Sequence, residues 1–126
     1  MKPGAQYVIV WEFRVRQARE AEFVQKYGPE GAWARFFRGS AGYIRTELVR
    51  DVADHLRYLT LDYWQTEEEF KRFRRQHLAE YERLDKEFEG LTESETRLGA
   101  FWTGKQAMDL RGIRLAKEQV CRTSKS

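Results

Sequence analysis

The sequence predicts an α+β fold in which four antiparallel strands form one sheet and the helices cover one of its faces. Four segments have the alternating, β-branched and aromatic composition that is typical of strands. Two segments have apolar residues three or four positions apart, as in amphipathic helices. The order is strand, helix, strand, strand, helix, strand, which is the ferredoxin-like βαββαβ arrangement. A chain of 126 residues suits one such domain and is too short for two ordinary ones.

The first strand and the first helical region come at the N-terminal end of this order. Residues 7–15, YVIVWEFRV, are apolar at both parities and predict a strand that is buried on both faces. Apolar residues then follow helical spacing on either side of a GPEG interruption, and they are Phe23, Tyr27, Trp33, Phe36 and Phe37. Pro29 suits the first turn of the second piece, where its missing N–H costs nothing. We therefore expect a bent or two-part helix.

Residues 43–51 and 56–64 predict the second and third strands. Both segments alternate in polarity and a short connection joins them, so they should pair antiparallel. Thr66 and Glu69 then have the spacing of a capping box, in which each side chain satisfies a free backbone N–H of the first helical turn. A second helix is expected to begin there.

The second helix carries one apolar stripe, and a histidine interrupts it. The stripe has the spacing 3, 4, 4, 3, 4 and consists of Phe70, Phe73, His77, Tyr81, Leu84 and Phe88. We expect one continuous helix that ends at Gly90 and is followed by a last strand at residues 96–102. His77 stands where the pattern calls for a large apolar side chain, which makes it a candidate functional residue.

The positive charge of the chain is concentrated at its C-terminal end. The net charge is +3, and residues 103–126 hold six basic and two acidic residues, so residues 1–102 are close to neutral. We expect a folded domain at 1–102 and a basic tail at 103–126 that is flexible or a short helix. An RNA recognition motif has the same strand order, but residues 56–64 lack the glycine that its third strand needs. No nucleic-acid partner is expected.

Neither a membrane protein nor a metal protein is indicated. The chain has no run of eighteen apolar residues and no apolar segment of the secretory type near its N-terminus. A single cysteine, Cys121, excludes an internal disulfide and a thiolate metal cluster. His55 and His77 do not have metal-ligand spacing. The sequence therefore predicts a cytoplasmic protein without membrane association or a metal site.

The sheet face that the helices leave open is also expected to be apolar. The first and third strands carry large apolar residues at both parities, and these are Val8, Ile9, Val10, Trp11, Tyr58, Leu59, Leu61 and Trp64. A monomer would expose a larger apolar patch than the few hundred Å² that soluble monomers tolerate. We therefore expect an isologous homodimer in which the two sheets face each other.

Residues 42–77 resemble the antibiotic biosynthesis monooxygenase (ABM) domains of the dimeric α+β barrel superfamily. The shared features are a glycine-aromatic start of the second strand followed by TELVRD, a tryptophan that closes the third strand, a phenylalanine six residues later, and a histidine on the next helix. The likeness extends over residues 7–102. It implies a dimeric α+β barrel with a pocket between sheet and helices, in which molecular oxygen oxidises a hydroxyaromatic or quinol substrate without metal or flavin.

The same resemblance indicates whether a cofactor is expected and which residues could line the pocket. A related branch binds haem through an asparagine on the first strand, but the matching residue here is Phe13, which cannot donate that hydrogen bond. No cofactor is therefore expected. The aromatic residues that could line a pocket for a planar ligand, each of which could equally fill the core, are Trp11, Phe13, Trp33, Phe36, Tyr43, Trp64 and Phe73.

Three residues are candidates for catalysis. His77 has an intrinsic pKa of about 6.5 and would be the base that deprotonates the substrate, or it could pack as a neutral ring against a carbonyl. Trp64 would form a wall and be an electronic partner of the substrate. Asp62 shares its strand face with Trp64 and could orient His77, accept a proton itself, or pair with Arg45 or Arg97. Either arginine could instead hold a substrate oxyanion.

The sequence and the resemblance together predict a cofactor-independent monooxygenase that acts on a hydroxyaromatic or quinol-type molecule. The alternative is a non-catalytic ligand-binding or regulatory dimer of the same fold. Oxygen consumption distinguishes these two functions, because only the first uses molecular oxygen.

Overall fold

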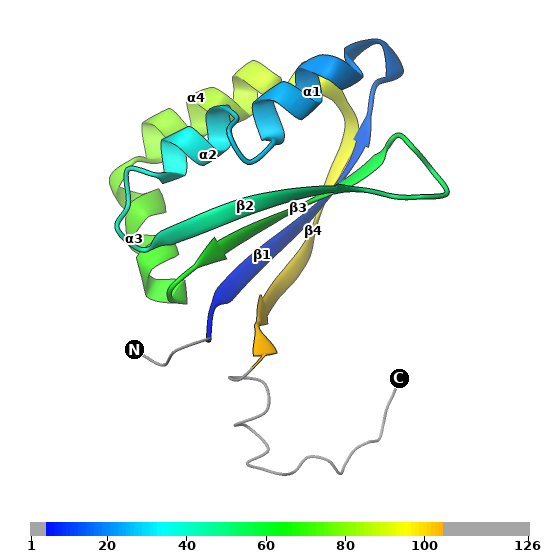
Figure 1. Cartoon of the computed structure of the whole chain (residues 1–126). Coiled ribbons are helices and arrows are strands. Elements are labelled where there is room, and N and C mark those ends of the chain that lie inside the picture. Colours follow the sequence, from blue (N-terminus) through cyan, green and yellow to red (C-terminus); the bar gives the residue numbers. More distant parts are fainter. Residues whose placement is uncertain (1–4, 105–126) are drawn as a thin grey trace.

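The computed structural model describes residues 5–104 (Figure 1). The elements in chain order are β1 (Tyr7–Val15), η1 (Gln17–Arg19), α1 (Glu20–Tyr27), α2 (Ala32–Phe37), β2 (Tyr43–Arg50), β3 (Arg57–Trp64), α3 (Glu67–Gln76), α4 (Leu78–Phe88), η2 (Glu89–Leu91) and β4 (Thr92–Trp102). Beyond Gly104, the tail predicted at 103–126 lies outside the described residues.

The strands form one antiparallel sheet in the order β2-β3-β1-β4. Helices α1, α2 and α4 lie over one face of this sheet, and α3 lies at one end of it (Figure 1). The predicted α+β, ferredoxin-like βαββαβ fold is thus confirmed. The structure contains one chain, so the homodimer stays a prediction. No helix within residues 5–104 has the length and apolar character needed to cross a membrane.

The first helical region is in two parts, as predicted, because the chain turns sharply between α1 and α2. A Cβ atom at Gly31 would lie 2.5 Å from the carbonyl oxygens of Gln25 and Lys26, so only glycine fits where the turn passes the end of α1. Pro29 precedes Gly31, the N-cap of α2, and is therefore in the turn instead of the first turn of the helix.

The helix expected to run unbroken to Gly90 is interrupted at His77, which corrects the prediction. His77 has φ −125° and ψ 33°, outside the helical region, and it separates α3 from α4. The two helices share Phe36 and Phe37 as partners and each has one more: the ring centroid of Phe73 in α3 lies 5.8 Å from that of Trp64, and that of Tyr81 in α4 lies 5.2 Å from that of Trp33. Packing on both partners overrides the local helical pattern.

The start of α3 contains half of the predicted capping box. The Thr66 hydroxyl accepts a hydrogen bond from the Glu69 backbone N–H at 3.1 Å. The Glu69 carboxylate does not return the bond but accepts one from Arg72 at 2.9 Å. A Cβ atom at Gly42, which precedes β2, would lie 2.4 Å from the Glu69 Cβ, so the close approach of strand and helix requires glycine there.

Strand β4 is longer than the predicted 96–102, because it includes Thr92–Glu95 from the TESE segment. This segment lacks an apolar pattern because β4 is an edge strand whose side chains are mostly exposed. A bulge opposite Val10 and Trp11 shifts the register between Gly99 and Arg97.

The core lies between the sheet and the helices and is mainly aromatic. Its buried members are Tyr7, Ile9, Phe13, Val15, Phe23, Tyr27, Trp33, Phe37, Tyr58, Trp64, Phe73, Leu84, Phe88 and Leu91. The opposite, helix-free face is less uniformly apolar than predicted. It combines residues such as Leu59 and Leu61 with an Arg57–Glu12 ion pair and with Arg45 stacked on Tyr63.

Candidate functional site

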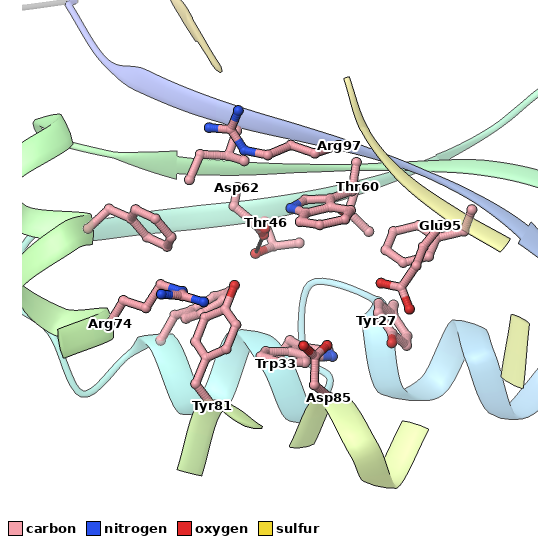
Figure 2. A pocket seen from close by; sticks show the side chains of 15 residues that line it. Tyr27, Trp33, Thr46, Thr60, Asp62, Arg74, Tyr81, Asp85, Glu95 and Arg97 are labelled. Carbon is pink, nitrogen blue, oxygen red and sulfur yellow. Dashed lines mark hydrogen bonds between the residues drawn. The ribbon is translucent and has the colours of Figure 1, made fainter. Parts of the chain in front are cut away.

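A cavity of about 290 Å³ lies between the sheet and the helices (Figure 2). The sheet contributes one wall, formed by Ile9, Trp11, Phe13, Thr46, Thr60, Asp62, Glu95 and Arg97. The helices contribute the other wall, formed by Tyr27, Trp33, Phe37, Phe70, Arg74, Tyr81 and Asp85. The cavity lining therefore combines seven aromatic side chains with seven polar or charged ones.

Strand register explains why Asp62 lies in the cavity wall. In the antiparallel pairing, Asp62 of β3 is opposite Ile9 of β1 on one side and Thr46 of β2 on the other. Residues directly opposite each other point to the same face of a sheet. Trp11 and Thr60 form the next row on this face. The alternation of β3 thus places a carboxylate among apolar and hydroxyl side chains.

A short chain of hydrogen bonds holds the Asp62 carboxylate. The Thr46 hydroxyl donates to Asp62 Oδ1 at 2.6 Å. The Tyr43 hydroxyl lies 2.7 Å from the same Thr46 oxygen. Since the only hydroxyl proton of Thr46 is used on Asp62, Tyr43 is the donor in the second bond. One oxygen of Asp62 is thereby fixed, while Oδ2 forms no hydrogen bond with a residue between 5 and 104.

Burial dominates the electrostatics of Asp62. It raises the pKa of this carboxyl from 3.8 to about 6, and the Thr46 hydrogen bond opposes part of that rise. Burial disfavours the charged form, whereas the hydrogen bond stabilises it. Asp62 forms no ion pair with a basic side chain in the described part of the chain, including Arg45 and Arg97. The predicted ion pair is therefore absent there, and the carboxyl is free to exchange a proton near neutral pH.

The helical wall supplies neutral hydrogen-bonding groups. Burial raises the pKa of both Tyr27 and Tyr81, so both phenols stay protonated at neutral pH. The indole N–H of Trp33 is buried near the Tyr27 hydroxyl but forms no hydrogen bond of good geometry with a residue between 5 and 104. An unpaired buried donor costs free energy, so an acceptor that reached it would stabilise the bound state.

Besides Asp62, four charged residues line the cavity, two of each sign. Figure 2 shows Arg74 and Arg97 toward the end that holds Asp62, and Asp85 and Glu95 toward the other end. The Arg74 guanidinium carbon lies 4.9 Å from the centre of the Tyr81 ring. Burial raises the pKa of both Asp85 and Glu95.

Five of the predicted site residues line this cavity. They are Trp11, Phe13, Trp33, Asp62 and Arg97. The structure brings them together from β1, α2, β3 and β4, so three of the predicted aromatic residues line the two walls of one cavity. Their roles toward a ligand stay predictions.

Three other predicted residues lie in the core beside the cavity. Trp64 is fully buried, with its ring centroid 5.3 Å from that of Phe37 and 5.2 Å from that of Phe70, and does not line the cavity. Phe73 is buried against Trp64, and the Tyr43 ring also packs on Trp64. These side chains pack behind the residues that line the cavity.

His77 and Arg45 lie away from the cavity. His77 is exposed at the junction of α3 and α4, where its ring centroid is 4.5 Å from that of Phe73. Arg45 is exposed on the helix-free face, stacks on Tyr63 at 3.9 Å and pairs with Glu47. The described chain therefore places neither side chain within reach of a molecule in the cavity.

Sequence reasoning did not select several lining residues. They include Thr46, Thr60, Tyr27, Tyr81, Arg74, Asp85 and Glu95. Thr46 and Thr60 had a usable signal, since each is a small polar residue at a buried position of an alternating strand. Arg74 had none, because its helical position was indistinguishable from that of the solvated arginines beside it.

Comparisons with known proteins extend these observations. The family model for antibiotic biosynthesis monooxygenase matches residues 6–83. No curated protein matches the chain significantly. A mutant form of SnoaB, a cofactor-independent oxygenase from Streptomyces nogalater, is 22% identical, with 80% of this chain and 94% of that one covered and a TM-score of 0.57. A protein from Bordetella bronchiseptica is 20% identical, with 80% and 97% covered and a TM-score of 0.61.

Proposed function

This chain belongs to the antibiotic biosynthesis monooxygenase family, and on that premise we propose that it is a cofactor-independent monooxygenase of a small hydroxyaromatic or quinol-type molecule. The observation that carries the proposal is Asp62, a carboxylate with a raised pKa in the wall of an aromatic cavity. SnoaB, which shares the fold, is a cofactor-independent oxygenase and supports the reaction type.

Asp62 is the proposed general base. Deprotonation is needed because the anion of a phenol or quinol gives up an electron to oxygen far more readily than the neutral molecule does. The rise of the Asp62 pKa from 3.8 to about 6 strengthens this base by about a hundredfold. The Oδ2 atom takes the proton while Oδ1 stays bonded to Thr46, so the carboxyl keeps its orientation during the transfer.

The remaining steps need only the substrate anion and molecular oxygen. One electron passes from the anion to oxygen, and the two radicals combine at a ring carbon that bears hydrogen to give a peroxide anion. Proton transfer from Asp62 converts this anion to a hydroperoxide and restores the base. Loss of water from this intermediate leaves a carbonyl group, so one oxygen atom enters the product and the other leaves as water.

The size of the cavity limits the substrate. Its volume of about 290 Å³ is at the lower end of the range of roughly 300–1,000 Å³ that ligand pockets occupy. Aromatic side chains such as Trp11, Phe13 and Trp33 favour a flat ring system. We therefore place the substrate among molecules of one to three fused rings.

The quaternary state and the location of the protein belong to the same proposal. We propose a cytoplasmic homodimer that is paired through the helix-free sheet faces, and apolar residues on that face favour the pairing. Val49 and Phe101 are 44% and 51% exposed in the single chain, and a second sheet would cover them. Sedimentation of the wild type and of Leu61→Glu tests the pairing, since a charge at the centre of that face should yield monomers.

Oxygen uptake tests the proposed reaction. Naphthols, naphthalenediols and related quinols are offered to the protein in an oxygen electrode, and the products are analysed after reaction with ¹⁸O-labelled oxygen. We expect one labelled atom in the product and one in water. Ligands that quench tryptophan fluorescence without any oxygen uptake across the panel would contradict the proposal and support a non-catalytic binding dimer.

A further inference from the structure

We propose that the hydroxyaromatic molecule bound in this cavity carries a carboxylate, and that Arg74 and Arg97 bind that carboxylate. This inference rests on the proposed function of the cavity and specifies the class of its substrate. A hydroxyaromatic carboxylate would present its hydroxyl to Asp62 and its anionic group to the two guanidinium groups.

The two arginines reach the same end of the cavity from opposite walls. Arg74 extends from α3 in the helical wall, and Arg97 extends from β4, where it is paired with Trp11 across the sheet. Figure 2 shows both guanidinium groups toward the Asp62 end of the cavity, with Tyr81 beside Arg74. A ligand that bridges the two walls there would meet both cations.

Neither arginine is committed to an acidic residue of the described chain. Eight other arginines between residues 5 and 104 form ion pairs, namely Arg14, Arg19, Arg38, Arg45, Arg50, Arg57, Arg72 and Arg83. Arg74 instead lies over the face of Tyr81, and its charge acts on Asp85 without an ion pair between the two side chains. Arg97 forms no hydrogen bond or ion pair within residues 5–104. Their planar donors remain available to a carboxylate.

The acidic residues of the cavity favour one orientation of such a ligand. Asp85 and Glu95 lie at the end away from the arginines, beside Tyr27 and Trp33 (Figure 2). A carboxylate placed at that end would meet two like charges, whereas at the arginine end it meets two opposite ones. The charge pattern thus selects ligands with one anionic end and rejects the reversed orientation.

Paired ligands test the inference in the absence of turnover. The binding of 6-hydroxy-2-naphthoate and of 2-naphthol is measured without oxygen by quenching of tryptophan fluorescence, since Trp11 and Trp33 line the cavity. The two probes have the same ring system and hydroxyl and differ by the carboxylate. We expect the naphthoate to bind about tenfold more tightly, and less so at high salt.

Matched variants assign that preference to the two arginines. Arg74→Gln and Arg97→Gln should each weaken naphthoate binding by about five- to twentyfold, while 2-naphthol affinity stays within about twofold. Arg75→Gln is the control, because this neighbour on α3 does not line the cavity. Circular dichroism verifies that each variant is folded.

Two outcomes would overturn the inference. One is equal affinity for the two probes, and the other is an unchanged naphthoate preference in the Arg74→Gln, Arg97→Gln double variant. Failure of the proposed function has a different signature. Tight naphthoate binding without oxygen uptake by any hydroxyarene would contradict the oxygenase proposal and support the anion site. Oxygen uptake that occurs with neutral hydroxyarenes alone would contradict the anion site and support the oxygenase proposal.

Discussion

Replacing Asp62 by asparagine should stabilise the folded protein at neutral pH. The pKa of Asp62 is raised from 3.8 to about 6 by folding, so the folded state holds its proton more tightly than the unfolded state does. The stability contributed by this group is therefore complete below pH 4 and is lost as the pH rises through about 6. A pKa shift of about 2 units corresponds to about 3 kcal/mol of folding stability. The wild type loses this stability as the pH rises, whereas the uncharged asparagine of the variant does not ionise and keeps it.

Urea unfolding at pH 4, 6 and 8 measures this effect. Asp62→Asn and the wild type should have similar free energies of unfolding at pH 4, and the variant should be more stable by about 2–3 kcal/mol at pH 8. Asp54→Asn is a control of opposite sign, because its hydrogen bond with Arg14 lowers the pKa of Asp54. That variant should be the less stable protein at pH 8 and approach the wild type in acid. A stability difference for Asp62→Asn that does not change with pH would refute the reasoning.

Two further substitutions probe the surroundings of the site. Thr46→Val removes the hydrogen bond to the Asp62 carboxylate, and a hydrogen bond to a charged group contributes about 1.5–3 kcal/mol. The midpoint of the pH dependence of kcat/KM should therefore rise from about 6 by about one to two pH units. An unchanged midpoint would contradict the assignment. Gly42→Ala places a Cβ atom 2.4 Å from the Glu69 Cβ and should lower the free energy of unfolding in urea by about 1–3 kcal/mol. Gly39→Ala is the control, because its Cβ contacts are 3.4 Å or longer and its free energy of unfolding should not fall.

The fold could be predicted from the sequence because its local signals are strong and agree with one another. Alternation on the strands, the break at GPEG and the Thr66 cap each indicate one element, and their order permits one simple sheet topology. The last strand was predicted too short because Thr92–Glu95 lie on an edge strand and carry no apolar pattern.

The candidate site was predicted only in part because its composition depends on register and on a helix break. The stripe that includes His77 is continuous in the sequence, but the packing of Phe73 on Trp64 and of Tyr81 on Trp33 separates α3 from α4 and leaves His77 exposed. No local pattern specifies such a break.

Strand register determines which of the two predicted arginines, Arg45 or Arg97, faces the cavity. Arg45 is opposite Tyr63 and so faces away from the helices, whereas Arg97 reaches the cavity through the bulge in the pairing of β4 with β1. Strand pairing is a tertiary property that the alternation of one strand cannot reveal. Asp62 was selected because it shares a strand face with Trp64, and Trp11 because it is aromatic; strand pairing brings both side chains to the face that the helices cover.

Oxygen uptake by Asp62→Asn and His77→Ala, compared with the wild type on one hydroxyarene substrate, tests the central claim most directly. Removal of a general base typically costs about 10²–10⁴-fold in rate, so Asp62→Asn should lose at least about a hundredfold in kcat while it still binds the ligand. His77→Ala should stay within about twofold of the wild type, because His77 is exposed and outside the cavity. Full activity in Asp62→Asn, or its loss in His77→Ala, would contradict the account.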